Sequence, residues 1–357
     1  MLYNVCGEII MINKDFGERV KELRKKYLMS QDELSDKSGI RREQISKIEN
    51  GQINVTLNTM DRLRKAFNLS IGDLMDFNIS EYKLKPFVKW AGGKTQILLK
   101  IKELMPEKYN NYFEPFVGGG SLFFNIAPVR AVINDSNEDL ILVYKCFKKQ
   151  SDYEQLLNLL KEHEMKHSKE YYYQIRDMDR LECYKNLSSV VRAARMVYLN
   201  KACFNGLYRV NSQGYYNVPS GQKNNVNTYN LENMEHLRKY FSNNKISVMN
   251  KDFEKVALKA KRGDFVYFDP PYDTFTDKDT FTSYSKEPFD KEEQRRLARV
   301  YRQLDGRGVK VMLSNHNTEF INHLYEGFNI RVIDAKRIIN SNAEGRGNVK
   351  EVIITNY

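Results

Sequence analysis

The sequence predicts a mixed α/β fold that follows a small all-helical unit, and three observations lead to this expectation. Residues 15–77 carry only helical patterns. After residue 84, short apolar segments typical of buried strands alternate with helical segments, which predicts a mostly parallel sheet covered on both faces. Residues 151–245 interrupt this alternation with helical sequence rich in tyrosine, lysine and asparagine. The expected segments are a helical unit at 12–78, the two halves of an α/β unit at 84–150 and 245–357, and an insertion at 151–244.

The composition is that of a globular chain. Of the 357 residues, 41% are hydrophobic, and no stretch approaches the roughly 18 uncharged apolar residues that a membrane span requires. The four cysteines lie far apart and form no CxxC pair, which argues against a disulfide framework or a zinc site. The first ten residues include Glu8 and no basic stretch, so we expect no signal peptide and predict a cytoplasmic protein.

The net charge of +11 is unevenly distributed. Residues 1–80 have a balance of +1, and the remainder of the chain carries +10. A strongly basic protein often has a polyanionic partner. Tyrosine and phenylalanine are frequent, at 23 and 19 residues, and aromatic rings among basic side chains suit stacking on nucleic-acid bases. The charge therefore favours contact with nucleic acid through the larger part of the chain.

Short helices are expected throughout the N-terminal unit. Phe16, Val20 and Leu23 share one face of the first helix. Ser30 and Glu33 have the spacing of a capping box at the start of the second, and Gly39 makes the turn into the third. The predicted helices cover residues 15–28, 30–38, 41–48, 56–67 and 71–75.

Two helices joined by a tight glycine turn form the helix-turn-helix plan. The segment SQDELSDKSGIRREQISKIENG, residues 30–51, resembles the lambda-repressor/Cro family. This resemblance implies that Gln31 contacts a phosphate and that Arg41, Arg42 and Gln44 face the major groove. The same pattern also fits a small bundle used for dimerisation or protein contact, and the near-neutral charge of the unit argues against tight DNA binding.

The α/β unit is expected to contain buried strands and one hairpin. Residues 208–218 predict a β-hairpin with Gly214 at the left-handed turn position. The strands are predicted at 111–117, 131–135, 264–269, 309–314 and 351–355, and a helix at 137–149.

A glycine-rich turn follows the first of these strands, in Phe113-Glu-Pro-Phe-Val-Gly-Gly-Gly-Ser121. Glycines at the start of a helix let the backbone approach a ligand closely. Asp135 ends the next strand, where an acid is suited to a pair of ribose hydroxyls. The spacing is not that of a dinucleotide fingerprint, but the turn and the acid together favour a ribose-containing ligand.

A second motif, Asp269-Pro-Pro-Tyr272, directly follows an apolar strand. The prolines stiffen the turn and donate no N–H group, so the Asp269 carboxylate and the Pro270 carbonyl form a pair of acceptors. An exocyclic amino group has two donors and matches that pair, and Tyr272 offers a face on which a base can stack. The alternative is a rigid structural loop with Asp269 as a helix cap.

The only tryptophan, Trp90, lies in Lys85-Pro-Phe-Val-Lys-Trp-Ala-Gly-Gly-Lys94. A lone tryptophan usually belongs to a core. Lysines and glycines are poor core neighbours, so we predict a binding loop here.

FVKWAGGK, FEPFVGGG and DPPY, in this order, resemble the Dam-type DNA adenine-N6 methyltransferases of the alpha group. The resemblance continues through ARMVYLNKACFNGLYRVNSQGYYNVP and covers essentially residues 84–357. It implies a Rossmann-like, S-adenosylmethionine-dependent methyltransferase sheet with an inserted helical and β-hairpin target-recognition domain. It also implies that the cofactor S-adenosylmethionine is held by a set of residues from these motifs. They are Trp90, Lys94, Asp135, Phe113, Glu114, Gly118 and Asp269.

The resemblance further implies a catalytic motif made of Asp269, Pro270 and Tyr272, acting on an adenine flipped out of duplex DNA, without a metal. Asp269 would accept a hydrogen bond from the amino group rather than act as a strong base, and methyl transfer would be direct.

For target reading, the resemblance places Arg209 on a guanine, Lys89 near the outer guanine and Phe204 as a wedge in the duplex. A phosphate contact is the alternative for Arg209. GATC is the expected target sequence.

The favoured function is therefore a site-specific, adenine-specific DNA methyltransferase of a restriction–modification system. The alternative is a self-repressing transcription regulator with secondary or lost methylase activity. Methylation of cytosine N4 or of RNA is disfavoured by Asp269 and by the Dam-like hairpin. We expect duplex DNA and the protein's own promoter as partners, and a monomer or weak dimer.

Overall fold

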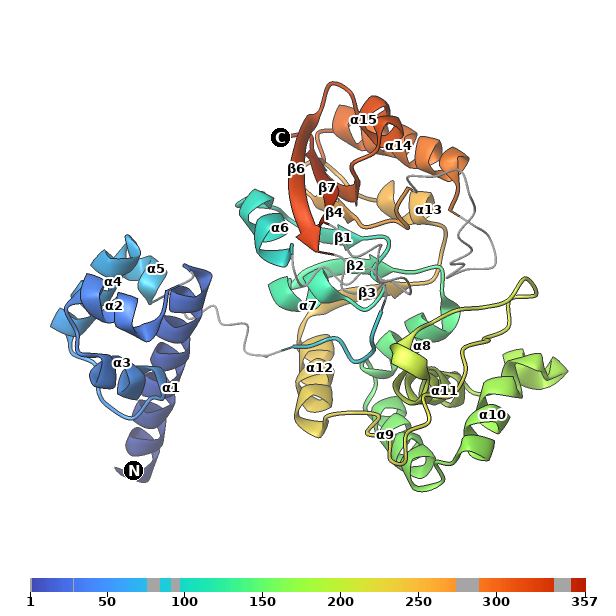
Figure 1. Ribbon diagram of the computed structural model, residues 1–357, viewed down its shortest axis with the longest axis horizontal. Coiled ribbons are helices and arrows are strands. Elements are labelled where there is room, and N and C mark those ends of the chain that lie inside the picture. Colours follow the sequence, from blue (N-terminus) through green and yellow to red (C-terminus); the bar gives the residue numbers. More distant parts are fainter. Residues whose placement is uncertain (1, 28, 76–83, 91–96, 274–288, 337–347) are drawn as a thin grey trace. The chain divides into compact units, whose positions relative to one another are not determined.

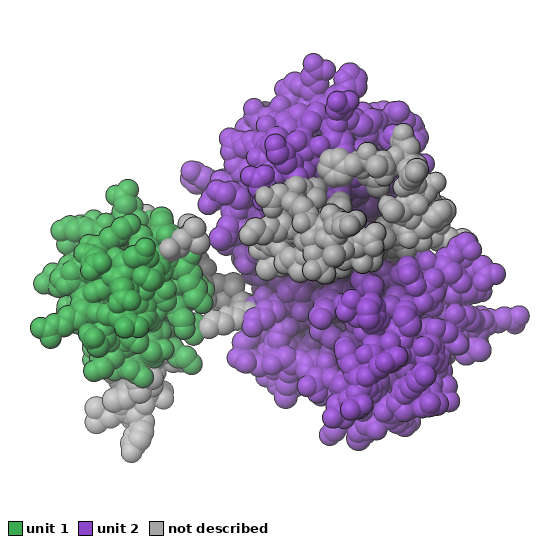
Figure 2. Space-filling view, in the orientation of Figure 1, with its two compact units in different colours: residues 1–83 green, residues 84–357 purple. Residues whose placement is uncertain are grey.

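The computed structural model describes residues 2–27, 29–75, 84–90, 97–273, 289–336 and 348–357. The chain folds into two compact units, residues 1–83 and residues 84–357, which Figures 1 and 2 distinguish. Among the described residues, no helix combines the length and the apolar character needed to cross a membrane.

The N-terminal unit contains the expected helix-turn-helix elements. Ser30 and Glu33 form the predicted capping box, and Gly39 ends α2 in the left-handed region with φ of 63°. The helices are α1 (Leu2–Lys26), α2 (Gln31–Ser38), α3 (Arg42–Glu49), α4 (Leu57–Phe67) and α5 (Ile71–Leu74). One expectation was wrong: the first helix begins at Leu2, not near Asp15, because no proline or capping break separates residues 2–14 from the rest of α1.

The core of this unit draws buried apolar residues from all five helices. Val20 of α1, Leu34 of α2, Ile45 of α3 and Leu63 of α4 are all fully buried. The apolar residues recur at helical spacing, which lets these helices share a single core.

In the larger unit, the described strands form one seven-stranded sheet in the order β3-β2-β1-β4-β5-β7-β6 (Figure 1). Strands β1 to β5 run parallel along the sheet, and β7 is antiparallel to both of its neighbours. The strands are β1 (Tyr112–Glu114), β2 (Arg130–Asn134), β3 (Lys245–Met249), β4 (Phe265–Phe268), β5 (Lys310–His316), β6 (Asn329–Lys336) and β7 (Asn348–Thr355). The predicted fold class, a Rossmann-like α/β sheet preceded by a helical unit, is confirmed.

Two strands were not predicted from the sequence, and both lie at the edges of the sheet. Strand β3 has the sequence KISVM, in which Lys245 and Ser247 are exposed. Strand β6 has the sequence NIRVIDAK, with Val332 52% exposed. Edge strands are covered on fewer sides and can carry charged residues, so they lack the continuous apolar pattern of central strands.

The handedness of the connections decides which helices cover which face. The chain moves from β1 to β2 to β3 in one direction along the sheet and then crosses to β4 and β5 in the other. Right-handed crossovers place the helices of these two runs on opposite faces. Helices α13 (Phe253–Ala257), α14 (Lys291–Gly306) and α15 (Glu319–Leu324) cover one face and bury an aliphatic and aromatic core against β4, β5 and β7.

Helices α7 (Ser121–Ile126), α8 (Glu138–Cys146) and α12 (Leu231–Asn243) form a second core that is largely aromatic. Its rings include Phe87, Phe124, Tyr144, Phe147 and Phe241, with neighbouring centroids 4.9–6.5 Å apart. Large rings contribute much buried area each, so this core fixes the elements around the glycine turn. Helix α6 (Leu98–Leu104) precedes the sheet.

The segment between α8 and β3 is mainly helical. Helix α11 packs against α8 and α9, and its centre is almost entirely buried. The predicted hairpin is present, with Gly214 at φ of 88°, but its antiparallel pairing consists of the single bridge between Val210 and Tyr216. The further elements are α9 (Gln150–Met165), α10 (Lys169–Asp177), α11 (Ser189–Ala202), and the 3-10 turns η1 (Met178–Arg180), η2 (Glu182–Asn186) and η3 (Phe204–Gly206).

Candidate active site

Two of the predicted motifs meet at the point where the strand order reverses. Strands β1 and β4 are neighbours in the sheet, with Tyr112 paired to Phe265 and Phe113 to Val266. The connections leave this pair in opposite directions, and ligands of open α/β sheets bind at the carboxyl ends of the strands at such a switch point. The glycine turn follows β1 and the Asp269 motif follows β4, so the fold brings both motifs to this switch point.

Asp269 is oriented by a hydrogen bond from the neighbouring strand. Its Oδ1 accepts from Ser314 Oγ of β5 at 3.1 Å. The Ser314 hydroxyl in turn lies 2.8 Å from the Tyr267 hydroxyl, and both of these side chains are fully buried. Asp269 itself is half-buried. This hydrogen bond fixes the position of the Asp269 Oδ1 atom.

The rest of the proline loop is held by polar side chains of α14 and β5. Gln294 Nε2 donates to the Pro271 carbonyl at 2.8 Å, and the Asp273 backbone N–H donates to Asn315 Oδ1 at 2.9 Å. Asn315 Nδ2 donates to Gln294 Oε1 at 3.1 Å and closes the network. Gln294 and Asn315 are buried, and the loop provides partners for their polar groups. These hydrogen bonds in turn fix the shape of the loop.

Tyr272 is held at both ends of its side chain. Its hydroxyl donates to Glu351 Oε2 at 3.1 Å, and its ring meets the His316 ring edge-to-face at 4.9 Å between centroids. Burial, together with the nearby Asp269 carboxylate, raises the pKa of Tyr272 well above its usual value. The phenol therefore stays neutral and presents a half-buried aromatic ring beside Asp269.

Asp135 uses one carboxylate oxygen to bind the glycine turn and the other to bind the start of α8. Its Oδ2 accepts from the Gly118 backbone N–H at 3.0 Å, and its Oδ1 accepts from the Asn137 backbone N–H at 2.8 Å. Burial raises the pKa of Asp135 to about 6, although the two backbone hydrogen bonds act in the opposite direction. Each carboxylate oxygen retains a second lone pair that can accept from a ligand hydroxyl.

The glycine turn lies directly against the Trp90 indole. Gly118 has φ of 48°, and a Cβ at this residue would lie 2.6 Å from Trp90 Cδ1. A Cβ at Gly119 would lie 2.9 Å from Trp90 Cβ. Only glycine allows this approach, which places a flat aromatic ring against the turn whose Gly118 N–H binds Asp135. An aromatic face and an acid fit a ligand that carries a purine and a ribose.

The other predicted cofactor residues are placed differently. Phe113 is buried in the core beneath α14, and Glu114 is 3% exposed, with its carboxylate accepting from the Tyr112 hydroxyl at 2.7 Å. Both side chains point into the protein interior. This part of the turn can therefore contact a ligand only through its backbone atoms. Lys94 lies outside the described residues.

The predicted DNA-contacting residues of the larger unit are exposed and carried by loops next to α11. Phe204 is 53% exposed on η3. The exposed Arg209 donates from Nε to Asn217 Oδ1 across the hairpin at 2.8 Å. Lys89 has an exposed side chain, while its backbone N–H and carbonyl are both bound by the Asn200 amide at 2.8 Å.

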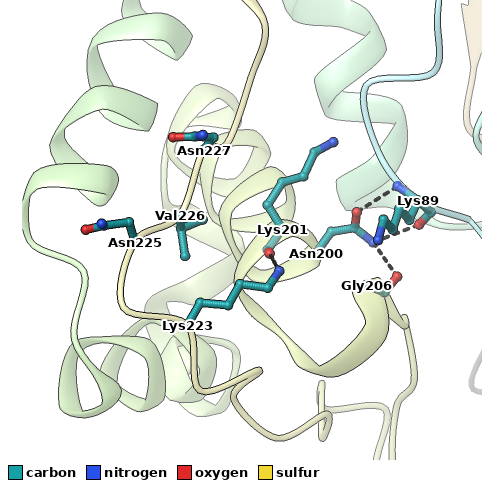
Figure 3. Close-up of a pocket in the computed structure, with 8 residues that line it drawn as sticks. All are labelled: Lys89, Asn200, Lys201, Gly206, Lys223, Asn225, Val226 and Asn227. Carbon is teal, nitrogen blue, oxygen red and sulfur yellow. Dashed lines mark hydrogen bonds between the residues drawn. The ribbon is translucent and has the colours of Figure 1, made fainter.

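Lys89 also borders a cavity of about 220 Å³, which Lys201 and Lys223 line as well (Figure 3). Lys223 Nζ donates to the Lys201 carbonyl. Burial and the charges of Lys89 and Lys223 lower the pKa of Lys201. Such mutual repulsion is relieved by an anion. The lining residues are Lys89, Asn200, Lys201, Gly206, Lys223, Asn225, Val226 and Asn227.

In the N-terminal unit, the exposed start of α3 carries Arg41, Arg42 and Gln44. Arg42 Nε lies 3.3 Å from Asp32 Oδ1 in a pair that is mostly exposed. Gln31 begins α2, but its side-chain Nε2 donates to the buried Glu49 at 2.9 Å. The side-chain amide of Gln31 therefore already makes a hydrogen bond within the N-terminal unit.

Comparison with known families decides the assignment. The profile of the D12 class of N6 adenine-specific DNA methyltransferases matches residues 90–339, well over half of the chain. The chain belongs to this family. A helix-turn-helix family profile matches residues 20–74. The D12-class enzyme described here is thus an adenine-specific DNA methyltransferase with an N-terminal helix-turn-helix region, as predicted, and its class uses S-adenosylmethionine.

Similar proteins include type II methyltransferases and DNA adenine methylases. The type II methyltransferase M1.LlaDCHI of Lactococcus lactis subsp. cremoris is 48% identical over 278 residues, which cover 78% of this chain and 97% of that protein. The type II methyltransferase M.MjaIII of Methanocaldococcus jannaschii is 43% identical, over 77% of this chain and 100% of that protein. The DNA adenine methylase of Escherichia coli K12 is 34% identical, over 76% of this chain and 95% of that protein.

Sequence reasoning missed several residues that shape the site of this D12-class methyltransferase. Ser314, Asn315 and Gln294 support the proline loop, and none of them was singled out. One signal was present: the run Ser314-Asn-His-Asn317 directly follows an apolar strand segment. Polar residues at the carboxyl end of a central parallel strand are candidates for the site at the switch point.

Proposed function

We propose that this D12-class methyltransferase transfers a methyl group from S-adenosylmethionine to N6 of an adenine flipped out of duplex DNA, within the sequence GATC. The observation that carries the proposal is the position of Asp269 and Pro270 beside the Asp135 and Gly118 turn at one switch point. Asp269 and Pro270 supply a pair of hydrogen-bond acceptors. Asp135 and the Gly118 turn supply a carboxylate and a closely approaching backbone for a nucleoside.

The chain's own groups would act on the amino nitrogen of adenine. That nitrogen is a poor nucleophile because its lone pair is delocalised into the ring. Asp269 and the Pro270 carbonyl would accept its two hydrogens, which favours a pyramidal nitrogen and stabilises the positive charge that develops on it. Ser314 orients Asp269, and the Tyr272 ring would stack on the base. Flipping the base costs a few kcal/mol, which duplex contacts must offset.

The cofactor would be held by Trp90, Asp135 and the backbone of the Gly118 turn. Asp135 would accept from the ribose hydroxyls, and the Trp90 ring would pack on the flat part of the molecule. When bound, S-adenosylmethionine supplies the methyl group on a positively charged sulfur. The nearby carboxylates and aromatic faces favour that cation. Lys94 stays a prediction of the sequence.

DNA would be read by the segment 151–244, acting as a target-recognition region. Arg209 would pair with a guanine, Phe204 would enter the stack, and Lys89 would lie near the outer guanine. The cavity shared by Lys89, Lys201 and Lys223 fits a backbone phosphate, because an anion removes the repulsion among the three ammonium groups. This pocket and the +10 charge of the larger part support duplex DNA as the substrate.

The decisive experiment is transfer of tritiated methyl from S-adenosylmethionine to synthetic duplexes. We expect label in a GATC duplex, none in a scrambled duplex, and loss of label in Asp269→Ala. Asp334→Ala, at an exposed aspartate of the edge strand, serves as the matched control. Label in both duplexes would reject GATC as the site. No label in any DNA, including genomic DNA, would reject the proposed activity.

Base flipping is tested separately with 2-aminopurine in place of the target adenine. Unstacking of this fluorescent base raises its emission, so the wild-type enzyme is expected to produce a large increase on binding. Phe204→Ala should reduce the increase if the ring helps to hold the duplex open. Unchanged emission in a duplex that demonstrably binds would count against flipping.

A second function is favoured by one observation in the N-terminal unit. Arg41, Arg42 and Gln44 are exposed together at the start of the second helix of the helix-turn-helix. We infer that this surface binds a separate DNA site, such as the protein's own promoter, in a restriction–modification system. A footprint on the upstream DNA, lost in Arg42→Ala, is the expected result.

A further inference from the structure

Tyr208 immediately precedes Arg209 and makes two contacts with residues around the glycine turn. Its ring stacks on the Trp90 indole, with centroids 5.2 Å apart and an angle of 29° between the planes. The side chain of Asn137 lies near its hydroxyl. Tyr208 is half-buried, so both contacts are shielded from solvent.

Both partners of Tyr208 are themselves attached to the proposed cofactor residues. Trp90 lies so close to Gly118 and Gly119 that a Cβ on either glycine would overlap the Trp90 side chain. The Asn137 backbone N–H donates to Asp135 Oδ1 at 2.8 Å. One side chain of the hairpin therefore touches the aromatic wall and the acid-bearing turn of the proposed cofactor site.

A second connection joins the other side of the hairpin to α8. The ring of Tyr216 meets that of Tyr208 edge-to-face at 5.5 Å, and the Tyr216 backbone N–H donates to Asp179 Oδ2 at 2.7 Å. Asp179 pairs with Arg195 at 2.9 Å, and Arg195 lies 3.8 Å from Asp139 in the first turn of α8. Arg195 is 4% exposed, so this ion pair is shielded from water and holds its geometry.

The hairpin needs such anchors because its own ladder is minimal. Val210 and Tyr216 form its single antiparallel bridge, and the hydrogen bond from Arg209 to Asn217 lies at the surface. A two-stranded hairpin is marginally stable without packing against other elements. The backbone at Arg209 is therefore held through its neighbour Tyr208, while the Arg209 side chain bonds to Asn217.

We propose that Tyr208 is a positioning residue that couples cofactor binding to the placement of the Arg209 hairpin, so that each ligand tightens the binding of the other. This inference rests on the proposed function, since it takes Trp90 and Asp135 as the cofactor site and Arg209 as a DNA contact. A ligand that fixes the Trp90 ring and the Asp135 turn fixes both partners of Tyr208, and the ordered hairpin then loses less freedom when DNA binds. Linkage requires the effect to be equal in both directions.

The test measures binding without turnover. S-adenosylhomocysteine is used as the cofactor-site ligand and a GATC duplex as the DNA. In the wild-type protein we expect S-adenosylhomocysteine to tighten duplex binding by about tenfold, within the usual range of coupling between sites. In Tyr208→Leu the factor should fall below about twofold. Tyr208→Phe keeps the stacked ring and should retain most of the coupling. Tyr173→Leu, at a half-buried tyrosine of α10, is the matched control and should behave as wild type.

Fluorescence gives an independent readout, because Trp90 is the only tryptophan of the chain. In the wild type, duplex added without cofactor should change the Trp90 emission through the stacked Tyr208 ring. In Tyr208→Leu that change should disappear even though fluorescence anisotropy of a labelled duplex still reports binding.

The outcomes separate the inference from the function on which it rests. If Tyr208→Leu weakens duplex binding equally with and without S-adenosylhomocysteine, the residue is merely structural and the proposal is wrong. If the wild type binds both ligands without coupling, the inference fails and the proposed function stands. If the wild type binds neither ligand, the proposed function fails and the coupling is overturned with it.

Discussion

At the scale of single residues, the site depends on which acceptor atoms are held in place and which are left to a substrate. Asp269 is fixed through Oδ1 by Ser314, and that bond is backed by the Tyr267 hydroxyl. Asp135 uses both oxygens for backbone N–H groups and keeps lone pairs for further donors. The two carboxylates have different surroundings, which suits them to two different tasks at the same switch point of the sheet.

Ser314→Ala is expected to lower kcat by roughly tenfold or more while changing KM for either substrate by less than about twofold. A hydrogen bond to a charged group is worth about 1.5–3 kcal/mol, and this one orients a group whose acceptor role matters most in the transition state. Steady-state methyl transfer measures the effect. Ser247→Ala, at an exposed serine on the edge strand β3, is the matched control. A change confined to KM would contradict the assigned role of Ser314.

The raised pKa of Asp135 predicts a pH dependence of cofactor binding. Burial raises this pKa to about 6, so the carboxyl gains a proton as the pH falls through that value. The protonated form has no charge and fewer free lone pairs, so S-adenosylmethionine affinity should decrease as pH is lowered from 7 to 5. Calorimetric titration over this range measures it. Asp135→Asn should bind weakly at every pH, and a wild-type affinity independent of pH would argue against the role of Asp135.

At the scale of elements, close approaches of backbone to side chain hold the site together. The glycine turn fits against Trp90 because Gly118 has neither a Cβ nor a restriction on positive φ. The proline loop is stiff through its composition and is fixed further by Gln294 of α14. The helix-turn-helix is held by a buried ion pair between α1 and α3, in which Arg24 Nε lies 2.6 Å from Glu49 Oε1.

Gly118→Ala is expected to weaken cofactor binding by about tenfold or more and to lower the Tm of the 84–357 unit by a few degrees. The left-handed backbone costs a side chain about 1–2 kcal/mol, and the new methyl group displaces the indole. Gly306→Ala is the matched control, since a Cβ there meets nothing within 4 Å. Cofactor titration and thermal unfolding test both variants, and equal effects at the two glycines would contradict the argument.

Glu49→Ala is expected to destabilise the N-terminal unit by about 3–5 kcal/mol, because it leaves the Arg24 guanidinium without its buried partner. Asp61→Ala is the control: its pairs with Arg64 and Lys65 are more exposed and should contribute little to stability. Circular dichroism of the full-length chain follows the loss of helix. A change of less than about 1 kcal/mol for Glu49→Ala would mean that the buried pair adds little net stability.

At the scale of the whole molecule, the chain combines two compact units with different balances of charge. The part that contains the catalytic motifs carries most of the excess positive charge, whereas residues 1–80 are nearly neutral. This distribution supports our proposal that contact with the phosphate backbone is concentrated in the methyltransferase unit. The helix-turn-helix would depend on specific contacts by Arg41, Arg42 and Gln44.

We predict that the two DNA-binding activities are separable in the full-length protein. Arg42→Ala combined with Gln44→Ala should abolish a footprint on the upstream DNA and leave methylation of a GATC duplex within about twofold of wild type. Asp269→Ala should have the opposite effect, with the footprint kept and methylation lost. Footprinting and tritium transfer measure the two activities. Loss of methylation in the first variant would show that the unit at 1–83 contributes to catalysis.

The sequence by itself determined the local features of this protein. The capping box at Ser30, the left-handed turns at Gly39 and Gly214, and the apolar central strands all follow from residues a few positions apart. The order of the FVKWAGGK, FEPFVGGG and DPPY motifs predicted the family, which the comparisons confirmed. The capping box, the turns and the strands are encoded by short-range spacing, and each motif is itself a short run of residues, so a sequence displays all of them directly.

Only the tertiary structure decided which distant residues meet. Asp269 and Ser314 are 45 positions apart in the sequence, and Lys89 and Asn200 are 111 positions apart. Neighbouring strands and packed helices bring each pair together. Tertiary packing also directs Phe113 and Glu114 inward and draws the Gln31 amide to Glu49. The edge strands β3 and β6 likewise depend on a sheet that is already formed. Such contacts arise from topology and burial, so no local pattern predicts them.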